Sequence, residues 1–123
     1  MQAVLLTASA AAVAGEGAAF QAGDVIDDEL SRAVVAYLRG AGLAWPRRSL
    51  DAVAEAMGSD VAERLGPRLE RLADEILYWP VDWDRHDLLS AMDVLRGGLA
   101  EHHPELSSEA VEALVWEFSY VYS

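Results

Sequence analysis

The chain has 123 residues, which is short enough for one domain and long enough to bury a hydrophobic core without crosslinks. It contains no cysteine, which excludes disulfides, thiolate metal sites and a cysteine nucleophile, and which favours a reducing, cytoplasmic location. Its net charge of −12 repels phosphate backbones and anionic lipids, so we expect it to bind neither nucleic acid nor membranes.

Residues 1–24 form an alanine- and glycine-rich segment that differs from residues 25–123, which we interpret as one helical domain. The apolar stretch from Gln2 to Ala14 ends in small residues, as a secretory signal does before its cleavage site. However, the basic start of such a signal is missing, since the first arginine is Arg32, and the stretch is too short to span a bilayer. The alternatives are a weak helix or strand packed on the domain, and an extension without fixed structure.

Two helices with clear ends are predicted next. Asp27 is a candidate N-cap, and Gly40 ends the helix that follows it. Ser49 caps a shorter helix, which Gly58 ends. The first of these helices carries its apolar stripe at Leu30, Val34, Tyr37 and Leu38.

A longer helix is predicted from residue 59 to Trp79, where Pro80 ends it. Its apolar residues recur at steps of three and four, as one face of a helix requires: Val61, Leu65, Leu69, Leu72, Ile76 and Trp79. Pro67 falls inside this pattern and predicts a kink or a brief break. Because the stripe keeps its phase across Pro67, both parts should face the same core, with Trp79 buried as part of it.

Two further helices complete the prediction. Asp84 is a candidate N-cap for a helix that runs to about His103, and the Gly97-Gly98 pair within it permits a bend or a close approach of another segment. Ser107 caps the last helix, which runs to about Tyr122. No strand-like alternation follows residue 24. The expected fold is therefore all-α, a compact single-domain bundle of about five helices.

The sequence contains none of the common catalytic or nucleotide-binding motifs. His86, with Asp82, Asp84 and Asp87 around it, has the composition of a cation site. The same residues also describe a solvated helix start, in which Asp84 caps the helix and Asp87 completes a capping box. We favour the second interpretation and expect a non-enzymatic protein without a cofactor or a resident metal.

The negative charge is concentrated in the last third of the chain. Residues 81–123 hold nine acidic residues and two arginines, which gives −7 of the total charge of −12. Trp83 lies among the acidic residues Asp82, Asp84 and Asp87. An asymmetry of this kind indicates a binding face for a basic partner. All nine basic residues are arginine, which together with abundant alanine indicates a GC-rich bacterial genome.

A second pair of aromatic residues lies on the last helix. In helical projection Trp116 and Tyr120 fall opposite the apolar face that contains Val115 and Phe118. One interpretation is an exposed aromatic pair ringed by carboxylates, and the other is a central helix that is covered from two sides. The predicted partner-binding residues are Asp82, Trp83, Asp84, Asp87, Glu109, Glu112, Trp116, Glu117 and Tyr120.

The segment Ile76-Leu77-Tyr78-Trp79-Pro80, the acidic residues after it and the helix with Arg96-Gly97-Gly98 resemble the partner-binding stretch of colicin-type nuclease immunity proteins. The Ser-Pro pair that follows the acidic residues in that family is missing here, and this chain is longer. We infer no family membership from so short a segment. The resemblance implies an analogy, in which a small acidic helical protein presents tyrosine and carboxylates to a basic enzyme.

The sequence therefore favours a protein-binding module whose acidic last third engages a basic partner. Its expected form is an immunity protein or antitoxin that inhibits a toxin. The alternative is an accessory subunit or adaptor of a larger assembly, and a third class is a small helical enzyme or metal-binding protein with a polar pocket around His86.

Overall fold

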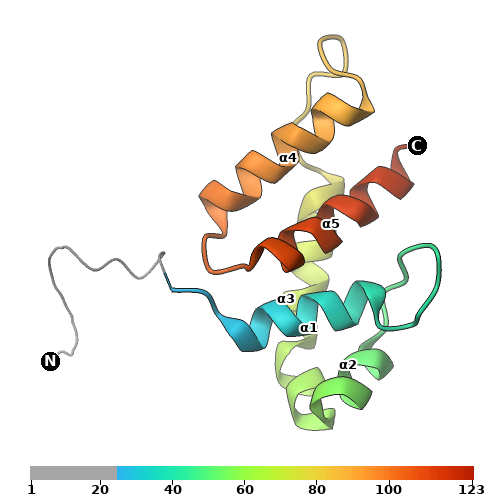
Figure 1. The fold of residues 1–123 in the computed structure, drawn as a ribbon, viewed down its shortest axis with the longest axis vertical. Coiled ribbons are helices and arrows are strands. Elements are labelled where there is room, and N and C mark those ends of the chain that lie inside the picture. The colour runs from blue at the N-terminus through green and yellow to red at the C-terminus, as the bar shows by residue number, and fades with distance from the viewer. Residues whose placement is uncertain (1–24) are drawn as a thin grey trace, which may run out of the picture.

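The computed structural model describes residues 25–123, and the predictions for residues 1–24 lie outside this range. The described chain is a bundle of five helices without strands (Figure 1). The helices are α1 (Asp28–Arg39), α2 (Leu50–Met57), α3 (Ser59–Leu77), α4 (Leu88–His102) and α5 (Ser108–Val121). The predicted all-α fold is thus confirmed. None of these helices is both long and apolar enough to cross a bilayer.

Three of the predicted N-caps are confirmed. The side chains of Asp27, Ser49 and Ser107 each accept a hydrogen bond from a backbone N–H three residues later, at 3.0, 3.1 and 3.2 Å. These bonds satisfy N–H groups that have no partner within the helix. The starts of α1, α2 and α5 are therefore set by local sequence.

The cap predicted at Asp84 is wrong, and α4 begins three residues later than expected. Residues 83–85 form a turn, in which the N–H of Asp84 donates to Oδ1 of Asp82. Asp87 is the cap instead, because its Oδ1 accepts from the N–H of Ser90 at 2.9 Å. The loop that precedes α4 is therefore longer than predicted and projects from the bundle, as the upper loop of Figure 1 shows.

Helix α3 continues without interruption across Pro67, so the brief break that the sequence predicts at this proline does not form. Pro67 itself is exposed, and its missing N–H costs a single backbone hydrogen bond. The buried face keeps its phase across it, since Leu69 is fully buried and Leu65 is partly buried against the core.

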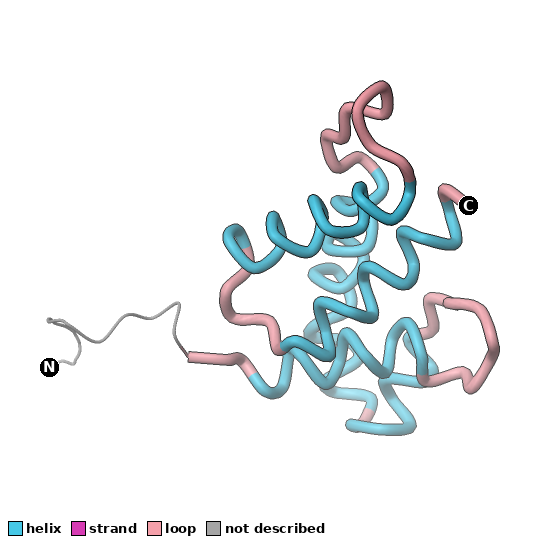
Figure 2. Tube along the Cα trace, turned by 45° about the horizontal axis from the view of Figure 1, so that its top comes forward, coloured by secondary structure: helices cyan, strands magenta, loops and turns pink. Residues whose placement is uncertain are grey.

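Helix α5 is the centre of the bundle. It packs against α1, α3 and α4, and Figure 2 shows it running between α4 and α1. Leu114, Val115 and Phe118 are each about 1% exposed. Of the two interpretations, the structure supports a central helix covered from more than one side for Trp116, which is partly buried, whereas Tyr120 is 49% exposed.

The predicted close approach at the glycine pair of α4 occurs at Gly98. A Cβ added there would lie 2.2 Å from Cζ2 of Trp79, whereas a Cβ on Gly97 would meet nothing within 4 Å. Trp79 packs on the outside of the core and is only partly buried, because α3 ends at Leu77 and not at Trp79 as predicted. The glycine thus lets the segment that follows α3 lie directly against α4.

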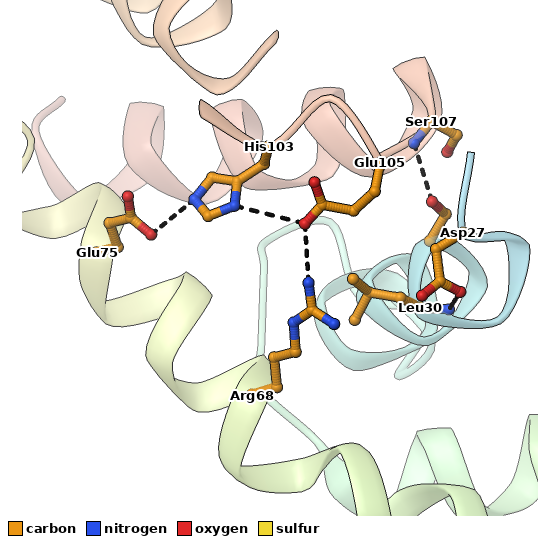
Figure 3. A network of polar contacts seen from close by, with 8 residues as sticks. Asp27, Leu30, Arg68, Glu75, His103, Glu105 and Ser107 are labelled. Carbon is orange, nitrogen blue, oxygen red and sulfur yellow. Dashed lines mark hydrogen bonds and ion pairs between the residues drawn. The ribbon is translucent and has the colours of Figure 1, made fainter. Parts of the chain in front are cut away.

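Polar contacts join the turn between α4 and α5 to α3 and to the start of α1 (Figure 3). Nε2 of His103 lies 2.9 Å from Oε1 of Glu75 on α3. Oε2 of Glu105 accepts from Arg68 on α3 at 2.8 Å, and its backbone carbonyl accepts from the N–H of Asp27 at 2.8 Å. These contacts fix the direction in which α5 enters the bundle.

Candidate partner-binding surface

The loop from residue 78 to residue 87 carries Trp83, whose indole lies over the end of the core. Its ring stacks on Phe118, with centroids 6.2 Å apart and planes 9° apart, and contacts the ring of Tyr122 at 5.3 Å. Phe118 is fully buried, yet Trp83 remains 45% exposed. One part of the indole is therefore supported by the core while the rest faces solvent.

Two tyrosines are exposed at the same end of the bundle. The hydroxyl of Tyr122 donates to the carbonyl of Leu77, which holds the C-terminal turn against the end of α3. Tyr78, the next residue after Leu77, is 85% exposed. Tyr122 lies just beyond the last residue of α5 and is 41% exposed.

Three carboxylates accompany these aromatic side chains. Asp82, Asp84 and Asp87 are exposed, and no ion pair within residues 25–123 involves them. The N–H of Ser90, which donates to the capping carboxylate, holds the pKa of Asp87 below its usual value. We call this surface the acidic aromatic end and define it as Tyr78, Asp82, Trp83, Asp84, Asp87 and Tyr122.

Acidic residues elsewhere on the bundle form ion pairs with arginine more often than the carboxylates of the acidic aromatic end do. The arginines that form ion pairs bind carboxylates on α1, α3, α4, α5 and the turn after α4: they are Arg48, Arg64, Arg68 and Arg96. At the acidic aromatic end the only arginine in the loop is Arg85, which forms none of these pairs within the described residues. The negative field there is therefore less compensated.

Trp116 and Tyr120 do not join the acidic aromatic end. Their rings contact each other edge to face at 5.8 Å, and the guanidinium of Arg39 lies 4.3 Å from the Trp116 ring centroid. The hydroxyl of Tyr120 donates to the carbonyl of Ala44 at 2.9 Å. Arg39 thus covers the Trp116 ring, whereas Tyr120 lies beside the loop between α1 and α2 and is 49% exposed. Both lie away from the face of α5 that contacts Trp83.

The three glutamates predicted around this pair have separate environments. Glu117 is only 8% exposed and accepts a hydrogen bond from Nε of Arg48 at 2.9 Å, so its placement on the surface was wrong. This carboxylate is buried because α5 is central in the bundle and because Arg48, from the loop between α1 and α2, binds it. Glu112 is bound by Arg96, whose hydrogen bond lowers the pKa of this carboxyl group. Glu109 is exposed beside α1.

The histidine of the loop is engaged in a local contact. Nδ1 of His86 lies 3.0 Å from Oγ of Ser90 in the first turn of α4. In the part of the chain that the structure describes, no three histidine or carboxylate side chains are grouped so as to hold a metal ion. The site that the geometry brings together is therefore one of exposed aromatic rings and carboxylates.

A comparison of the chain with protein-family models, with curated proteins and with solved structures finds no match. The acidic aromatic end combines supported aromatic rings with uncompensated carboxylates, and this combination suits contact with a basic macromolecule.

Proposed function

We propose that the chain is a non-enzymatic protein-binding module that engages a basic partner protein through the acidic aromatic end. The form that we favour is an immunity protein or antitoxin, which inhibits a basic toxin by binding it. The observation that carries the proposal is Trp83, which is 45% exposed although it stacks on the core, and which has the exposed carboxylates of Asp82 and Asp84 beside it.

The packing of the Trp83 indole on Phe118 favours a role for this side chain as an anchor residue in the interface with the partner. Tryptophan and tyrosine are enriched among the residues that dominate binding energy in protein interfaces. The contacts of Trp83 with Phe118 and Tyr122 restrict its rotamers before any partner arrives. Less side-chain entropy is then lost on binding, so more of the free energy of burying the ring contributes to affinity.

The carboxylates favour a role in association. Residues 81–123 carry a net charge of −7, and Asp82, Asp84 and Asp87 have no ion-pair partner among the described residues. Charges of this kind attract an oppositely charged protein over about one Debye length, roughly 8 Å in physiological salt. They raise the association rate more than the lifetime of the complex when they lie at the rim of an interface.

The alternative function is that of an accessory subunit or adaptor in a larger assembly. Trp45 and Leu50 are the observation in its favour, because both are exposed in and after the loop between α1 and α2. A permanent assembly would bury such apolar side chains, and the chain made alone would then self-associate.

Affinity capture with the full chain from an extract of the source organism, followed by mass spectrometry, tests the proposal. We expect a partner of positive net charge whose capture falls as the salt concentration rises. Capture should also fall for the variant Asp82→Asn/Asp84→Asn. A partner that is retained equally by this variant and at high salt would contradict the proposal. A self-associated chain would favour the accessory subunit.

A further inference from the structure

We propose that a groove next to the acidic aromatic end receives an arginine or lysine side chain of the partner. This inference rests on the proposed function and specifies the chemistry that the partner presents. The groove lies between the end of α3 and helix α4, with a volume of about 610 Å³. Among the residues that line it are Glu75, Tyr78, Trp79, Gly98, Glu101 and His102.

The wall of the groove is an aromatic ring in a fixed position. Trp79 lies so close to the backbone of α4 that a Cβ on Gly98 would be 2.2 Å from its Cζ2. The ring of His102 contacts the Trp79 ring at 5.8 Å, with an angle of 72° between their planes. Tyr78 stands beside Trp79 at the rim and is 85% exposed. Guanidinium and ammonium groups are attracted to such rings within about 6 Å.

Carboxylates flank this wall on both helices. Glu101 on α4 is exposed and forms no ion pair within residues 25–123. Glu75 on α3 contacts His103 through Oε1, as Figure 3 shows, and its Oε2 forms no hydrogen bond with a described residue. The groove therefore presents aromatic rings and two carboxylates to a cation.

The charge of the groove distinguishes it from others on the same molecule. Three further grooves among the described residues are lined by arginines as well as carboxylates, with Arg32 and Arg39 in one, Arg47 and Arg48 in the second, and Arg96 in the third. The groove at Trp79 contains two carboxylates and no arginine. An incoming arginine or lysine side chain would therefore meet no arginine in this groove, unlike in the other three.

Nuclear magnetic resonance can test the groove without the natural partner. The probe is the peptide acetyl-Gly-Arg-Gly-amide, and its control is the same peptide with neutral citrulline in place of arginine. The chain has four tryptophans, so the indole N–H resonances of Trp45, Trp83 and Trp116 serve as internal references for that of Trp79. We expect the arginine peptide to displace the Trp79 resonance most, saturably, and the citrulline peptide to leave it in place.

Two variants with the same loss of charge locate the effect. Glu101→Gln should raise the dissociation constant of the arginine peptide at least fivefold, whereas Glu55→Gln, at an exposed position on α2, should change it less than twofold. Tyr78→Ala, which removes an exposed ring without touching the core, should also weaken binding severalfold. The proposal is overturned if Trp79 responds no more than Trp45, Trp83 and Trp116, or if the variants Glu101→Gln and Glu55→Gln bind equally.

Failure of the groove and failure of the proposed function give different results. A peptide that does not bind, together with a basic partner whose capture depends on Asp82 and Asp84, removes the groove and keeps the function. A peptide that binds at Trp79, together with a partner that is insensitive to Asp82 and Asp84, removes the acidic aromatic end as the main contact. In that case the groove remains a cation site.

Discussion

Arg48 and Glu117, which are 69 residues apart in sequence, form an ion pair of 2.9 Å that ties the loop between α1 and α2 to the central helix. The same guanidinium donates to Oδ1 of Asp74 on α3 at 2.8 Å. Glu117 is almost fully buried, and its Oε1 has no hydrogen-bond partner among residues 25–123. One arginine therefore compensates a buried carboxylate and joins three parts of the chain.

Replacement of Arg48 by methionine should lower the free energy of unfolding by about 3 kcal/mol, because it leaves the charge of Glu117 buried without a partner. Arg47→Met is the matched control, since Arg47 is exposed and should change stability by less than about 0.5 kcal/mol. Urea unfolding of both variants measures the difference. Equal stability of the two variants would show that the pair does not hold the loop.

The two neighbouring glycines of α4, Gly97 and Gly98, should differ in how replacement by alanine changes the stability of the protein. Gly97→Ala should stabilise the protein by roughly 0.5–1 kcal/mol, because its Cβ meets open space and alanine favours the helix. Gly98→Ala should instead destabilise it by about 1 kcal/mol or more, because its Cβ would displace the Trp79 ring. Thermal or urea unfolding gives both values. If Gly98→Ala is as stable as Gly97→Ala, the contact with Trp79 is not tight.

The parts of the structure that depend on neighbours in sequence could be predicted from the sequence. Asp27, Ser49 and Ser107 cap helices through residues three positions away, so their roles are local. Asp84 and Asp87 both precede the same apolar stripe, and only the turn at residues 83–85 determines which of the two caps α4. The spacing of acidic residues therefore left the start of α4 uncertain by one turn.

The candidate site could be predicted only in part, because burial on α5 depends on distant segments. The sequence placed Trp83 among exposed acidic residues, and the structure has the same arrangement. It also placed Trp116 and Glu117 there, although Arg39 covers the first and Arg48 binds the second. Both arginines lie nearly seventy positions or more before the residues that they contact. Helical periodicity carries no information about contacts between such distant residues.

Acid should weaken the fold through two surface carboxylates. The hydrogen bond from Arg64 lowers the pKa of Glu29, and that from Arg96 lowers the pKa of Glu112. A lowered pKa in the folded state contributes stability above the unfolded value near 4.5, and this contribution is lost as the pH falls through the folded value. The loss should be smaller in Glu29→Gln/Glu112→Gln than in the control Glu55→Gln/Glu63→Gln. Urea unfolding between about pH 6 and pH 3 measures it, and equal losses would contradict the role of these pairs.

The two aromatic regions of the surface should differ in partner binding. Trp83→Ala should raise the dissociation rate about thirtyfold, which corresponds to about 2 kcal/mol, because it removes a supported anchor. Tyr120→Ala should change this rate less than about threefold, since Tyr120 lies on another side of α5. Circular dichroism must first show that both variants fold. A partner released faster by Tyr120→Ala than by Trp83→Ala would move the interface to the loop between α1 and α2.

The most direct test of the acidic aromatic end is the rate of association with the captured partner at low and at high salt. The test variant is Asp82→Asn/Asp84→Asn/Asp87→Asn, in which asparagine keeps the cap of α4. The control is Glu55→Gln/Asp60→Asn/Glu63→Gln, which removes the same charge from exposed positions on α2 and α3. We expect the test variant to associate at least about fivefold more slowly than the control at low salt, and equally at high salt. If both variants associate at the same rate at low salt, the partner uses another face and the proposal is wrong.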